Sequence, residues 1–168
     1  MYSLFVKNYF KSTLIIFFIL IVSRLVPHPP NFTCLIALSF YVPKLMGKKF
    51  VPALIFCFLI SDLLIGFHNV LFFTWGSIYL ISLTVNLFSN TILSRIYGSL
   101  LGAIIFFLFS NFGVWVIGSY GYTLNGLLSC YLLAIPFFGN SIISTLIYSS
   151  LFELFFKQKN LISKIVQI

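Results

Sequence analysis

Apolar runs separated by short polar breaks make up almost all of this sequence, and basic residues occupy every other break. Cytoplasmic loops of membrane proteins carry an excess of Lys and Arg. The alternation therefore predicts six membrane-spanning helices with both termini in the cytoplasm. Nine of the ten Lys and Arg residues follow this pattern: Lys7, Lys11, Lys44, Lys48, Lys49, Arg95, Lys157, Lys159 and Lys164.

The composition supports a membrane protein. Hydrophobic residues make up 61% of the 168 residues and charged residues only 7%, with a mean hydropathy of +1.12, whereas a soluble domain carries about 25% charged residues. Six spans of about 20 residues leave almost no chain for a soluble domain. The net charge of +8 is explained by orientation and by anionic lipid headgroups, so it does not indicate nucleic acid.

The apolar runs predict an all-α bundle in a single integral membrane domain, residues 1–168. The last third of the chain is too long for one span and too short for two. Because Pro136 divides it, we expect a short helix over 124–134 that lies at the outer surface or re-enters the membrane. The six spans are expected at residues 9–26, 32–46, 50–66, 70–89, 96–117 and 136–156.

Arg24 and Asp62 lie near the predicted outer ends of the first and third spans. A charged side chain at the centre of a span costs roughly 2.5–3.5 kcal/mol on insertion scales, so such residues usually face the interior and pair with one another. Two interpretations stay open. The pair is either a salt bridge that joins the two spans or a substrate contact at the mouth of a cavity.

Two histidines and an asparagine also lie in the outer breaks. His28 and Asn31 belong to the proline-rich break after the first span, and His68 to the break after the third. Two histidines with Asp62 could bind a metal, but no close spacing such as H-x-x-x-H supports this, and we predict no metal site. We expect these side chains to bond a ligand or to shape the loops.

Aromatic residues cluster toward the predicted outer interface, among them Trp115, Tyr120 and Tyr131. They form either an aromatic belt at the membrane surface or an aromatic wall that stacks on a planar ligand. Asn111 carries an amide that is costly in hydrocarbon, so we expect it to hydrogen-bond inside the bundle. Asn140 could offer its amide to a ligand.

The inventory of catalytic groups is small. The chain has two acids, Asp62 and Glu153, and the charge pattern puts them on opposite sides of the membrane, where they cannot act as an acid–base pair. The sequence contains no nucleophile elbow, phosphate-binding loop or zinc-helix motif. We therefore expect no enzyme activity and no cofactor, and ATP-driven pumping would need another protein.

Three stretches resemble a known family: residues 23–33 (SRLVPHPPNFT), 61–68 (SDLLIGFH) and 110–115 (SNFGVW). Gly126-Leu127, Cys130-Tyr131 and residues 134–138 add shorter matches. Over about residues 20–155, the chain resembles a bacterial family of membrane proteins of unknown function that are described as transport proteins.

That family is in turn similar to the substrate-binding S components of energy-coupling-factor (ECF) vitamin transporters. The resemblance implies a six-helix bundle with an outward pocket for a scarce micronutrient, and an ATP-driven coupling module as a partner. The first span lacks the Ala-x-x-x-Ala with which such S components meet their coupling partner, so a solitary transporter stays open.

Together these features predict a multi-pass protein of the bacterial inner (plasma) membrane that binds a small, vitamin-like solute from the outer face. Its other partner is the lipid bilayer. The alternative is a structural or accessory subunit of a membrane complex, braced internally by Arg24 and Asp62. The expected substrate-binding residues are Arg24, His28, Asn31, Asp62, His68, Asn111, Trp115, Tyr120, Tyr131 and Asn140.

Overall fold

A computed structural model of the chain describes residues 2–165, with side chains described for residues 10–157. Helices account for 82% of it and no strand occurs among the described residues, which confirms the all-α class. The side chains of Lys7, Lys159 and Lys164 lie outside the described residues. The helices are α1 (Tyr2–Leu25), α2 (Leu35–Tyr41), α3 (Val51–Ile65), α4 (Leu71–Thr84), α5 (Ile92–Val116) and α6 (Leu124–Ile165), with the short turns η1 (Val42–Met46), η2 (Lys48–Phe50) and η3 (Val85–Leu87).

Several helix boundaries coincide with residues that favour the start or the end of a helix. α1 stops just before Pro27, which has no backbone donor and restricts the residue before it. Gly47, at a φ of 99°, turns the chain between η1 and η2, and Gly66, at 119°, ends α3; both values favour glycine. At the start of α5, the Thr91 hydroxyl accepts a hydrogen bond from the Ser94 N–H, an N-cap that fixes where the helix begins.

The predicted division of the last segment is wrong, because α6 is one continuous helix of 42 residues. The structure has no separate helix over 124–134, and Pro136 lies inside α6. A proline removes one backbone hydrogen bond, here the one to the Leu132 carbonyl, while the neighbouring turns keep theirs. Packing of α6 along α5 offsets that loss. At 1.5 Å per residue, α6 is about 63 Å long, twice the thickness of a bilayer's hydrocarbon core.

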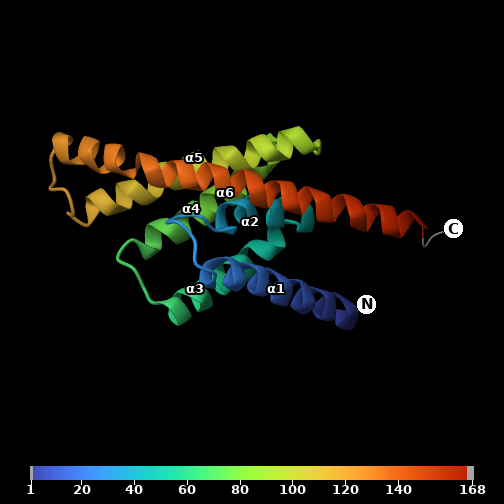
Figure 1. The fold of residues 1–168 in the computed structure, drawn as a ribbon. Helices are drawn as coiled ribbons and strands as arrows, with labels where there is room; N and C mark the ends of the chain where they lie inside the picture. The colour runs from blue at the N-terminus through green and yellow to red at the C-terminus, as the bar shows by residue number, and fades with distance from the viewer. Residues whose placement is uncertain (1, 166–168) are drawn as a thin grey trace.

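The helices run back and forth, so the start of α1 and the end of α6 lie toward the same end of the bundle (Figure 1). α5 packs along α6, α4 packs on α5, and α1 packs on α3. α2 contacts α4, α5 and α6, and all of its residues are buried. The core therefore forms around α2, with Phe40 at its centre.

Large apolar side chains cover the outside of the bundle, and Phe72, for example, is 80% exposed. Two stretches, α5 and Leu124–Lys157 of α6, are long and apolar enough to cross a membrane, with mean hydropathies of 2.0 and 1.7. Only 28% of the most apolar window of each is buried, whereas the core helix of a soluble protein is mostly buried. Length and composition thus give weak evidence for a membrane location.

Candidate functional site

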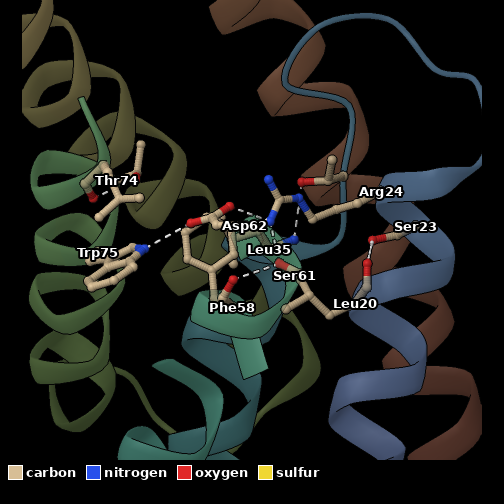
Figure 2. A network of polar contacts seen from close by, with 11 residues as sticks. Leu20, Ser23, Arg24, Leu35, Phe58, Ser61, Asp62, Thr74 and Trp75 are labelled. Carbon is tan, nitrogen blue, oxygen red and sulfur yellow. Dashed lines mark hydrogen bonds and ion pairs between the residues drawn. The ribbon is translucent and has the colours of Figure 1, made fainter. Parts of the chain in front are cut away.

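Arg24 and Asp62 form an ion pair that joins the last turn of α1 to α3 (Figure 2). Nη1 of Arg24 donates to Oδ1 of Asp62 at 2.6 Å and also to the hydroxyl of Ser61. The guanidinium carbon lies 4.7 Å from the centre of the Phe58 ring. The face of α3 that contacts Arg24 carries Phe58, Ser61 and Asp62, because residues three and four positions apart share one face of a helix.

Asp62 is fully buried, and each of its carboxylate oxygens accepts a hydrogen bond. Trp75, from α4, donates its indole N–H to Oδ2 at 3.0 Å. Because a buried carboxylate is stable only when it is paired and hydrogen-bonded, these contacts hold α1, α3 and α4 together. Sequence reasoning missed Ser61 and Trp75. Ser61 could have been found as the polar neighbour of an acid in an apolar run, whereas nothing in the sequence pointed to Trp75.

One edge of the Arg24 guanidinium has no partner. Neither Nε nor Nη2 makes a hydrogen bond with any residue that the structure describes, and the side chain is 15% exposed. Figure 2 shows only Nη1 turned to Asp62 and Ser61. Three N–H groups of a fixed, permanently charged side chain, one on Nε and two on Nη2, are therefore left for other acceptors.

Arg24 lines a cavity of about 540 Å³. Its walls come from the ends of α1, α3 and α5, the starts of α2, α4 and α6, and the loops beside them. Much of the wall is apolar, and none of the described residues that line it is an Asp or a Glu. The polar lining residues are Arg24, His28, Asn31, Thr33, His68, Thr74, Ser110, Asn111 and Tyr120.

Six of the ten predicted site residues are among these lining residues. Nδ1 of His28 lies 2.8 Å from the Pro29 carbonyl oxygen, which can only accept, so Nδ1 carries a proton. Asn31 has a φ of 63°, a left-handed conformation that asparagine tolerates. Asn111 donates to the Phe107 carbonyl of its own helix at 2.7 Å, which leaves its amide oxygen for other donors.

The other four predicted residues do not line the cavity: Asp62, Trp115, Tyr131 and Asn140. Asp62 lies behind Arg24. The Tyr131 hydroxyl donates to the Leu108 carbonyl at 2.7 Å, and the Asn140 amide donates to the Pro30 carbonyl at 3.1 Å. These two side chains hold α6 to α5 and to the loop after α1. Trp115 packs among the aromatic rings of α5 and the following loop.

A second buried ion pair lies toward the opposite end of the bundle, and sequence reasoning missed it. Arg95, predicted as a loop charge, is only 6% exposed. Its Nε and Nη2 donate to the two oxygens of Glu153 at 2.6 and 2.5 Å. Tyr41 donates its hydroxyl to the same carboxylate at 2.8 Å. The pair joins α2, α5 and α6, and the chain's two arginines thus hold its two acids.

The residues around the cavity suit the binding of a ligand better than acid–base or metal chemistry. Asp62 and Glu153 belong to separate ion pairs that share no residue. Among the described residues, no group of three or more His, Cys, Asp or Glu could hold a metal ion. The arrangement instead offers a half-open cavity with an oriented guanidinium, histidine and amide groups, and apolar walls. These are the features of a small-molecule binding site.

No curated protein and no solved structure matches the chain. A family does match, over residues 6–164. This range contains the whole cavity wall and both ion pairs. The chain therefore belongs to the family of unknown function DUF6580.

Proposed function

We propose that this protein crosses the bacterial inner membrane six times, with both termini in the cytoplasm. The alternation of basic and non-basic breaks supports this orientation. The exposed apolar side chains support contact with lipid on all sides of the bundle. The second crossing is the stretch Leu35–Met46, which comprises α2 and η1 and is shorter than a full-length span. Because α2 is completely buried among the other helices, it needs no lipid-facing surface.

The proposed function is the binding of a small solute from the outer face, as a transporter or as the substrate-binding subunit of one. The observation that carries this proposal is the cavity of about 540 Å³ with Arg24 fixed in its wall, because ligand sites of roughly 300–1,000 Å³ with a few oriented polar groups are typical of proteins. The resemblance to S components favours a vitamin or another micronutrient. Movement of the solute then needs rocking of the bundle or an ATP-driven coupling module.

Mass spectrometry of small molecules released from the gently purified protein tests this function. Val114→Trp narrows the cavity with a bulky indole ring, because Val114 lines it. Val116→Trp is the matched control, since Val116 lies two residues further on the same helix and is 38% exposed. Both variants are first compared with the unmodified protein by thermal melting, so that a loss of folding is not mistaken for a loss of binding.

The expected result is one non-lipid compound that accompanies the unmodified protein and Val116→Trp but not Val114→Trp. Cells that depend on uptake of that compound should then lose uptake with Val114→Trp alone. If only lipid is released from all three proteins, solute binding is wrong.

The burial of Asp62 favours a second function, that of an accessory subunit of a membrane complex in which the ion pair is only a brace. Replacing Arg24 and Asp62 together by Met and Leu separates the two functions. A folded protein without uptake supports the solute site, whereas loss of folding supports the brace.

A further inference from the structure

We propose that the solute carries a carboxylate, which binds to the Nε and Nη2 edge of Arg24. This inference rests on the proposed function, because it names the chemistry of the solute in the same cavity. It follows from which nitrogens of the guanidinium are occupied and which are not.

The occupied and free nitrogens lie on different edges of the guanidinium. Nη1 donates to Asp62 and Ser61, so the contacts that fix Arg24 use one nitrogen only. Nε and Nη2 carry parallel N–H bonds, and their spacing matches the two oxygens of a carboxylate. Asp62 therefore orients the side chain and leaves the bidentate edge free.

The charges around the cavity also favour an acid. No Asp or Glu belongs to the described lining, so nothing on the wall repels a carboxylate. Asp62 is fully buried behind the guanidinium. His28 and His68 also lie on the wall, and their ring nitrogens can hydrogen-bond a ligand.

A monocarboxylate with an apolar body fits better than a phosphate. Among the lining residues that the structure describes, Arg24 is the single permanent cation, and Asp62 offsets part of its charge. A phosphate would bring nearly two negative charges. Phe58 packs against the Arg24 guanidinium, and Leu35 and Ile36 add apolar wall to the same cavity. They suit the carbon skeleton of a solute whose polar end is held by the guanidinium.

Binding of matched acids and amides tests this inference. The full chain in lipid nanodiscs is titrated with benzoate, nicotinate and indole acetate, and with benzamide, nicotinamide and indole acetamide, by isothermal titration calorimetry. Each amide keeps the shape of its acid and removes the charge. At least one acid should bind about tenfold or more tightly than its amide, because a charge-assisted bidentate pair is lost.

Arg24→Lys removes the bidentate edge and keeps a positive charge beside Asp62, so it should markedly reduce the preference for acid over amide. Arg95→Lys is the matched control, since it alters the other arginine and the other ion pair, away from the cavity. It should leave the ratio of acid to amide affinity unchanged, and melting curves of both variants show whether they are folded.

Equal affinity for acids and amides in the unmodified protein would overturn the carboxylate inference and leave the solute site standing. The same holds if no acid binds and the compound that accompanies the purified protein is neutral. If no acid binds and no compound accompanies the protein, both the inference and the proposed function fail.

Discussion

Removing one partner of the Arg24–Asp62 pair should cost different amounts of folding free energy, depending on which partner is removed. In Arg24→Met, a carboxylate that is fully buried keeps only its hydrogen bond from Trp75. In Asp62→Asn, the remaining guanidinium is 15% exposed and lines the cavity, so solvent can reach it. The burial of the group that is left behind therefore sets the cost.

The two costs can be put in order from known magnitudes. An uncompensated charge in a buried pair costs about 3–5 kcal/mol, and we expect Arg24→Met in this range. A polar group that loses a partner but keeps others costs about 1–3 kcal/mol, and we expect Asp62→Asn here, because Arg24 keeps its contact with Ser61. Arg24→Met combined with Asp62→Leu should cost less than Arg24→Met alone, since no charge is left buried.

Reversible unfolding in mixed detergent micelles measures these costs. The chain has two tryptophans, and Trp75 contacts Asp62 directly, so tryptophan fluorescence reports the loss of this contact. Replacing Trp115 by Phe in all proteins makes the signal specific to Trp75. A cost of Asp62→Asn equal to or above that of Arg24→Met would refute the reasoning from burial, as would a double variant less stable than Arg24→Met.

Two further pairs of variants are measured by the same unfolding assay. The methyl group added by Gly98→Ala would overlap the Phe40 ring and should lower the free energy of unfolding by about 1–3 kcal/mol. The methyl group added by Gly139→Ala meets open space, so this variant should raise the free energy of unfolding by about 0.5–1 kcal/mol through helix propensity. Equal effects of the two variants would contradict the packing of Gly98 against Phe40. At the second ion pair, Tyr41→Phe should cost about 1 kcal/mol and Glu153→Gln about 3–5 kcal/mol, because it leaves a buried guanidinium without its counter-charge. A larger loss for Tyr41→Phe would show that the tyrosine, and not the ion pair, holds this end together.

Helix ends can be predicted from the sequence where the residue itself forbids a helix. The closely spaced prolines after α1 do this locally, and the glycine after α3 favours an end because it readily adopts a positive φ. Pro136 is different, because the loss of a single backbone hydrogen bond is small against the packing of a long apolar helix. Contact with α5 decides the outcome there, and such a contact cannot be read from the residues around the proline.

The cavity wall is only partly predictable for a similar reason. His28 and Asn111 stand out as polar residues near the ends of apolar runs, and both line the cavity. Tyr131 and Asn140 stand out equally, but each reaches a backbone carbonyl and does not line the cavity. Ser110 gives no signal, because a helical serine usually bonds to its own helix, as this one does. Which polar groups reach the cavity depends on the distances between helices.

The difference between the two arginines is the strongest structural argument for a ligand at the cavity end. Arg95 uses all three of its nitrogens, two on Glu153 and one on the Asn90 carbonyl. Arg24 has the same chemistry and an equally close carboxylate, yet it uses only Nη1. A brace is most stable when every donor is occupied by the protein, as at Arg95. At Arg24, the Nε and Nη2 edge, which suits an anionic partner, is left unoccupied by the protein. The cavity that this arginine lines is large enough for a small solute.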